Sequence, residues 1–143
     1  MQIPSALDLE SFANAAADAI IVADAEGNII LWNPAAERLF GYAEIEALGR
    51  SLDLIIPERL RERHWAGYEK VMRTGETRYG REVLRVPAQH KDGRTLSLAF
   101  TVALLRLKDG TRAIAAIMRD ETERWNEERE IRKRLAELEA RKG

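Results

Sequence analysis

One stretch of the chain alternates strictly between apolar and other side chains. It reads "TLSLAFTVALL" and covers residues 95–105. Every second position carries a large apolar side chain, namely Leu96, Leu98, Phe100, Val102 and Leu104. Because successive side chains of a strand point to opposite faces, this pattern predicts a long strand with one buried face. The turn sequence "KDG" stands on both sides of it, at 91–93 and 108–110, and indicates hairpins to both neighbouring strands.

Four more strands are predicted around this one. "REVLRVPA" (81–88) precedes the first turn, and "TRAIAAIMRD" (111–120) follows the second. Near the N-terminus, two β-branched runs surround the turn sequence "AEGN", which predicts a hairpin of Ala19–Ala23 with Ile29–Trp32. The chain therefore has two strands, then a segment without strand periodicity, then three strands in consecutive hairpins.

Helical signals occupy the remaining sequence. A short helix is predicted within "ALDLESFANAAAD" near the N-terminus. Pro34 favours a first helical turn and Gly41 closes that helix, while Ala43–Leu48 forms another short one. A longer helix opens near Pro57 and stops at Gly75. The fold class predicted is α+β, with an antiparallel sheet covered on one face by helices.

Composition excludes several classes of function. A length of 143 residues favours one domain, and the balance of 23 basic against 24 acidic residues argues against a nucleic-acid-binding or membrane-binding surface. No apolar run reaches the roughly 18 residues of a membrane span, and the N-terminus lacks a signal pattern, so we expect a cytoplasmic location. The chain has no cysteine, which excludes disulfides, cysteine metal ligands and a cysteinyl cofactor adduct.

The composition changes abruptly at Asp120. The last 24 residues contain 8 acidic and 7 basic side chains and read as one helix. Arg124, Ile131 and Leu138 are seven residues apart, with Leu135 between the last two. This thin stripe leaves two interpretations open, a solvated helix with ion pairs along its surface or a helix that dimerises.

Taken together, these segments resemble a PAS domain. The resemblance is carried by "WNPAAERLFGY" at Trp32–Tyr42, "LGRSLDLIIP" at Leu48–Pro57, the "KDGR" turn before the long strand, and "RDETER" at Arg119–Arg124. The pattern is most similar to PAS sensor domains of bacterial histidine kinases. It implies a five-stranded antiparallel sheet in the order 2-1-5-4-3 with helices on one face. The implied division is an N-terminal flanking helix at 1–17, a PAS core at 18–120 and an output helix at 121–143.

The same resemblance implies a function. PAS domains are sensory or interaction modules rather than enzymes, hold a ligand or cofactor between sheet and helices, and often form dimers. The implied partners are a small-molecule ligand, a second copy bound through the terminal helices, and a downstream kinase or other effector domain. The alternatives are a ligand-free dimerisation scaffold and a haem-based gas sensor. The residues expected to line the ligand site are His64, Tyr68, Val71, Leu98, Phe100, Ile114, Met118, Trp32 and Asn33.

His64 is the residue with the most specific expectation. It shares a helical stripe with Leu60, Tyr68 and Val71, which places it among apolar neighbours. The segment "IPERLRERHWAGY" resembles the one that carries the haem-ligating histidine in oxygen-sensing histidine kinases, so His64 would be a metal ligand if haem is bound. Arg81 and Arg85 are then candidates for contacting bound oxygen. The other interpretation is a histidine at the rim of an apolar core.

The sequence also gives expectations for a flavin site and for the second histidine. A non-covalent flavin would use Trp32 as a ring neighbour and Asn33 as a polar partner, although Trp32 also suits a strand end and Asn33 a helix cap. His90, next to the first "KDG" turn, is expected to be an exposed loop histidine.

At the start of the output helix, the expected signal relay consists of Arg119, Asp120 and Thr122. The Asp120 carboxylate suits the cap of the helix that follows. In the family the matching aspartate often pairs with a basic side chain, which would couple the last strand to the helix. Plain helix capping without a signalling role is the alternative.

Overall fold

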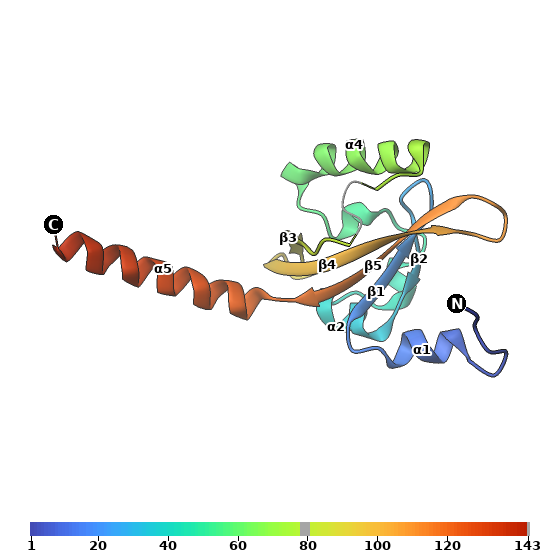
Figure 1. Ribbon diagram of the computed structural model, residues 1–143, viewed down its shortest axis with the longest axis horizontal. Coiled ribbons are helices and arrows are strands. Elements are labelled where there is room, and N and C mark those ends of the chain that lie inside the picture. Colours follow the sequence, from blue (N-terminus) through green and yellow to red (C-terminus); the bar gives the residue numbers. More distant parts are fainter. Residues whose placement is uncertain (78–80, 143) are drawn as a thin grey trace.

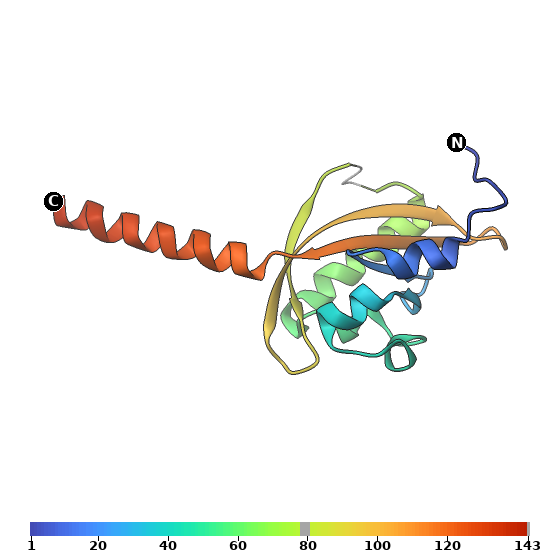
Figure 2. The same cartoon turned by 90° about the horizontal axis from the view of Figure 1, so that it is seen from below.

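The computed structural model describes residues 1–77 and 81–142. The sheet and the helices that flank it are shown in Figures 1 and 2. In chain order the elements are α1 (Leu9–Ala15), β1 (Ala19–Ala23), β2 (Ile29–Trp32), α2 (Pro34–Phe40), α3 (Glu44–Ala47), the 3₁₀ turn η1 (Leu52–Leu54), α4 (Glu58–Thr74), β3 (Leu84–Gln89), β4 (Thr95–Arg106), β5 (Arg112–Asp120) and α5 (Thr122–Lys142).

The five strands form one antiparallel sheet in the order β2-β1-β5-β4-β3, which confirms the predicted topology. β4 and β5 pair along most of their length, from Arg106 opposite Arg112 to Leu98 opposite Asp120. The alternation in β4 is also confirmed at its first half, where Leu96 and Leu98 are buried. The predicted first residue of β3 was wrong, because the strand begins at Leu84 rather than at Arg81.

α2, α3 and α4 lie on the same side of the sheet (Figure 2). The largest fully buried side chains beneath them are Trp32, Phe40, Ile21, Ile29 and Leu98. The rings of Trp32 and Phe40 pack at 5.5 Å between centroids, and Trp32 Nε1–H donates to the Tyr42 carbonyl at 3.0 Å. This core joins β1 and β2 to α2 and to the middle of the sheet.

The ends of α4 were predicted correctly. Pro57 is its N-cap residue, and Gly75 ends the helix in the left-handed region with φ 73°. The Gly75 N–H donates to the Val71 carbonyl at 2.8 Å, the usual way in which a glycine closes a helix. α4 is thus a helix of 17 residues that lies alongside the sheet (Figure 1).

The two terminal helices contribute no buried residue to the domain. On α1, Leu9 and Phe12 are 56% and 64% exposed. α5 extends away from the sheet (Figure 1), and its apolar residues Ile131, Leu135 and Leu138 are all exposed. Within residues 1–77 and 81–142, no helix combines the length and the apolar character of a membrane span.

Candidate functional site

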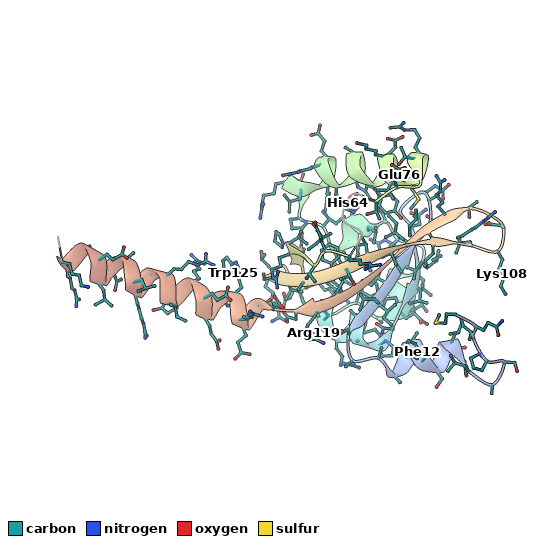
Figure 3. The ribbon with its side chains drawn as sticks, in the orientation of Figure 1. Phe12, His64, Glu76, Lys108, Arg119 and Trp125 are labelled. Carbon is teal, nitrogen blue, oxygen red and sulfur yellow. The ribbon has the colours of Figure 1, made fainter. Side chains whose placement is uncertain are left out.

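Three aromatic side chains, those of His64, Trp65 and Tyr68, project from the middle of α4. His64 lies on the side of the helix that faces the strands (Figure 3). Its ring meets Trp65 edge to face, with 4.7 Å between centroids, and lies 5.7 Å from the ring of Tyr68. The Tyr68 hydroxyl donates to the Asp24 carbonyl at the end of β1, at 2.5 Å. Burial raises the pKa of this phenol, so Tyr68 acts as a neutral donor.

His64 has a polar atom without a partner. Its Nδ1 is buried and makes no hydrogen bond within the part of the chain that the structure describes. Burial lowers the pKa of the imidazole, and the nearby Asp53 carboxylate opposes this effect more weakly. The ring is therefore neutral near pH 7. A neutral imidazole is the form that binds a metal or exchanges hydrogen bonds with a neutral ligand.

The lowered pKa of His64 predicts how stability depends on pH. As the pH falls through about 6.5, the unfolded chain takes up a proton at His64 before the folded chain does. Protonation of His64 therefore lowers the free energy of unfolding progressively as the pH falls from about 6.5 to the lower pKa of the folded state. Above about pH 6.5 His64 has no such effect. We expect wild type to lose more stability than His64→Gln between about pH 7.5 and about pH 5.5 in urea denaturation. Equal losses of stability in both proteins would contradict a lowered pKa of His64 in the folded state.

α4 is held at its first half by polar contacts to η1. Trp65 Nε1–H donates to Asp53 Oδ1 at 2.7 Å, and Arg61 donates to the Ile56 and Asp53 carbonyls at 3.0 and 3.2 Å. The ring of Trp65 also lies against Gly27 in the β1–β2 turn, where a Cβ would be only 2.2 Å from the ring. These contacts fix the position from which His64 faces the sheet.

β4 and β5 carry the residues that were expected to line the ligand site opposite α4. Phe100 is paired with Met118, and Leu104 is paired with Ile114, so the expected lining residues of β4 and β5 share one face of the sheet. Leu98 and Met118 belong to the core around Trp32, and the half-buried Phe100 packs against that core. Ile114 is also half-buried.

The stripe of α4 is separate from that core. Tyr68 is buried but is not among the residues packed around Trp32, and Val71 is half-buried. The apolar side chains of α4 and those of β4 and β5 therefore do not form a single packed core.

The described residues form an open groove beside α4. Its lining residues are Ala25, Glu26, Trp65, Tyr68, Glu69, Met72 and Arg73. Of the expected lining residues, only Tyr68 borders it. The groove includes no residue of β4 or β5, so it is not the space between α4 and these strands.

Asn33 has a structural role that uses its whole hydrogen-bonding capacity. Its side-chain oxygen accepts from the N–H groups of Ile20 and Ala36, at 2.9 and 3.0 Å, which caps α2. Its amide donates to the Ala13 and Asp18 carbonyls, at 2.9 and 3.1 Å. The side chain is 2% exposed and has no donor left for a flavin in this arrangement. The helix-cap interpretation is thereby confirmed.

The structure corrects two other expectations. Arg85 is paired with Ala99, whose side chain points to the face opposite that of Phe100, so Arg85 cannot contact a ligand beside His64. Its guanidinium instead pairs with Glu121 at 3.4 Å. The prediction of an exposed His90 was wrong as well. Its side chain is 13% exposed and packs against Gly41, where a Cβ would be 2.6 Å from the ring.

The first turn of α5 is joined to β4 through Ser97. The Ser97 N–H donates to Thr122 Oγ1 at 2.9 Å, and the Glu121 N–H donates to the Ser97 carbonyl at 2.8 Å. Asp120 Oδ1 accepts from the N–H and the hydroxyl of Thr122, at 2.9 and 2.5 Å. Asp120 therefore orients Thr122, as expected for a cap, and Thr122 connects the helix to the sheet.

The ion pairs at this junction are made by the neighbours of Asp120. Arg119 pairs with Asp18, just before β1, through two contacts of 3.2 and 3.3 Å. Glu121 pairs with Arg85 of β3. Sequence reasoning missed Asp18 and Glu121 and gave Arg85 a different role, although the alternation of a strand indicates that residues 119 and 121 share a face. The segment that leads from β5 into α5 is thus held to β3, to β4 and to the residue before β1.

No group of three or more histidine, aspartate and glutamate side chains is arranged for metal binding within residues 1–77 and 81–142. His64 alone would serve as a protein ligand to a metal, and only to one that brings its own remaining ligands, as haem does.

Comparison with known proteins places these features in a family. Sensor protein FixL of Bradyrhizobium diazoefficiens is 29% identical over 130 residues, which are 91% of this chain and 26% of FixL. Oxygen sensor protein DosP of Escherichia coli is 28% identical over 92 residues, 64% of this chain and 11% of DosP. This chain therefore spans only a small part of either relative.

A solved structure agrees with the fold. The PAS domain of a protein from Colwellia psychrerythraea superimposes with a TM-score of 0.68 at 22% identity, over 80% of this chain and 95% of that one. The family model of the PAS fold matches residues 7–120, which include every strand of the sheet and the helix α4. The chain belongs to the PAS family.

Proposed function

We propose that this PAS sensory domain binds a small ligand between α4 and the strands β4 and β5, and passes the signal to α5. The observation that carries the proposal is the buried Nδ1 of His64, which has no partner in the described part of the chain. An unmatched buried polar group costs about 1–3 kcal/mol. A ligand that hydrogen-bonds to this atom, or fixes the ring through its other nitrogen, would recover that cost.

The sheet wall supports the same site. Phe100, Val102 and Ile114 are half-buried although they lie on the central strands, beneath a helix. Central strands covered by a packed helix normally bury such side chains completely. A ligand with an apolar body and one hydrogen-bonding group matches this lining, in which Val71 and Phe100 are the apolar contacts and His64 is the polar one.

Haem is one specific candidate for this ligand. DosP is by name an oxygen sensor, and the segment around His64 resembles the haem-ligating segment of oxygen-sensing kinases. His64 fits the group, because its imidazole is neutral and no described residue hydrogen-bonds to its Nδ1. Bound haem, held by His64, would supply an iron that binds a diatomic gas. Non-covalent flavin has less support, since the amide of Asn33 is fully used.

The relay to α5 runs through the end of β5. Movement of this strand reaches the helix directly, because Asp120 orients Thr122 and Thr122 is bound to Ser97 of β4. Arg119 connects the same point to Asp18, next to α1. In this proposal the core at 18–120 senses the ligand, and the segments 1–17 and 121–143 carry the response.

The response acts on a second copy of the chain and on an effector. A helix of 21 residues with no buried side chain is poorly stable alone in water, and pairing along Ile131, Leu135 and Leu138 would stabilise it. The apolar side chains Leu9 and Phe12 of α1 are similarly exposed. Homodimerisation through these helices and coupling to a downstream kinase or other effector domain complete the proposal.

The test is ligand binding by the purified protein. We expect native mass spectrometry to show a retained small molecule, or hemin titration to give a sharp Soret band that shifts on reduction and with CO. Either signal should be lost in His64→Ala and kept in His90→Ala, the matched control at the other histidine. If wild type retains no small molecule and gives no Soret band, the dimerisation scaffold replaces the sensor as the function.

A further inference from the structure

The C-terminal end of α4 is held by a side chain from the sheet. Arg112 Nη1–H donates to the Met72 carbonyl at 2.6 Å and to the Arg73 carbonyl at 3.3 Å. Gly75 leaves the space for this contact, since a Cβ there would lie 2.5 Å from Arg112 Nη2. The arginine therefore sits directly over the last turn of the helix.

This contact suits the chemistry of a helix end. The last carbonyls of a helix have no partner within it, and they form the negative end of the helix dipole. A guanidinium offers several donors in one plane, so it can bind two neighbouring carbonyls with charge-assisted hydrogen bonds. Arg112 thus satisfies acceptors at Met72 and Arg73 that α4 itself leaves open.

Arg112 also has a particular place in the sheet. It is the first residue of β5, and the strand ends at Asp120, which orients the first turn of α5. The other polar contacts of α4 described above lead elsewhere, from Arg61 and Trp65 to η1 and from Tyr68 to the end of β1. Among these contacts, only that of Arg112 joins α4 to the strand that continues into α5.

We propose that Arg112 is a positioning residue that holds the end of α4 on the sheet and couples movement of α4 to α5 through β5. The inference rests on the proposed function in one respect, since it takes α4 as the ligand-facing helix. β5 is hydrogen-bonded on both sides, to β1 and β4, and it connects Arg112 at its first residue to Asp120 at its last without a break.

Hydrogen exchange measures the holding part of the proposal without any ligand. We expect Arg112→Gln to increase amide exchange in the last turn of α4, residues 71–75, at least severalfold, while exchange around Trp32 is unchanged. Arg106→Gln is the matched control. Arg106 is paired with Arg112 across the sheet, carries the same charge and makes no side-chain hydrogen bond or ion pair in the described part of the chain. Equal exchange in all three proteins would overturn the proposal.

The coupling is measured with the three tryptophans, one in each relevant place: Trp65 on α4, Trp125 on α5 and Trp32 in the core. With fluorotryptophan incorporated, ¹⁹F NMR reports each separately. Tyr68→Phe removes the hydrogen bond from α4 to Asp24 and so loosens the hold on this part of the helix. We expect it to shift the Trp65 and Trp125 signals in the wild-type background, and the Trp65 signal alone in the Arg112→Gln background, with Trp32 constant.

Two results would overturn the coupling. One is a change in the Trp125 resonance of the same size with and without Arg112, because the effect of Tyr68→Phe would then reach α5 through other residues. The other is no Trp125 shift in either background, because α4 would then not be coupled to α5. Neither result depends on ligand binding, so failure of this proposal is distinguishable from failure to retain a small molecule or to bind hemin.

Discussion

Replacing Asn33 with alanine is expected to lower the free energy of unfolding by roughly 4 kcal/mol, at about 1 kcal/mol for each hydrogen bond removed. The side chain is 2% exposed and binds the N–H groups of Ile20 and Ala36 and the carbonyls of Ala13 and Asp18. Alanine leaves these groups without their partner in a place that water reaches poorly. The expected loss of stability is therefore the sum of four moderate hydrogen-bond contributions at one residue.

Urea denaturation of Asn33→Ala beside Asn14→Ala measures this effect. Asn14 is exposed on α1, so its replacement is expected to change stability by less than about 0.5 kcal/mol. Hydrogen exchange should also show that α1 detaches in Asn33→Ala, because the amide of Asn33 connects the Ala13 carbonyl to the core. A loss below about 1 kcal/mol would show that water replaces the amide easily.

The order of the strands could be predicted because the signals for it are local. Alternation in residues 95–105 and the two "KDG" turns identify the β3–β4–β5 hairpins from neighbouring residues alone. Gly75 and Pro34 mark helix ends for the same reason, since φ and the missing N–H are properties of the residue itself. The start of β3 was misplaced because residues 81–83 have strand-like composition but no strand partner.

The site could be predicted only in part. Helical spacing places His64 in the stripe of α4, and the structure puts it on the side of the sheet. Two of the contacts that fix α4 were not predictable, because they join residues far apart in the chain, Tyr68 with Asp24 and Arg112 with Met72. A single sequence contains no local signal for such pairs.

The junction between β5 and α5 illustrates the same limit. The contact of Asp120 with Thr122 could be expected, because such a contact acts within one helical turn. The ion pairs of the neighbouring residues depend on the sheet register, which brings Asp18 to Arg119 and Arg85 to Glu121. The family pattern suggested a basic partner for Asp120, whereas in this chain the paired charges stand at the positions before and after it.

Replacing Gly27 with alanine is expected to destabilise the domain by roughly 3 kcal/mol and to displace Trp65 from the β1–β2 turn. Two costs add. Gly27 has φ +85°, a conformation that costs an L-residue about 1–2 kcal/mol. The added Cβ would also lie 2.2 Å from the ring of Trp65, and relieving such a contact in a packed place costs about 1–3 kcal/mol.

Gly49→Ala separates the two costs. Gly49 has φ +82°, nearly the same backbone, but nothing lies within 4 Å of its added Cβ. We therefore expect this control to lose only about 1–2 kcal/mol in urea denaturation. The ¹⁹F NMR signal of Trp65 should shift in Gly27→Ala but not in Gly49→Ala, because the ring must leave its contact with Asp53 when it moves. Equal losses in the two variants, with Trp65 unchanged, would mean that α4 is not held against the turn by Trp65.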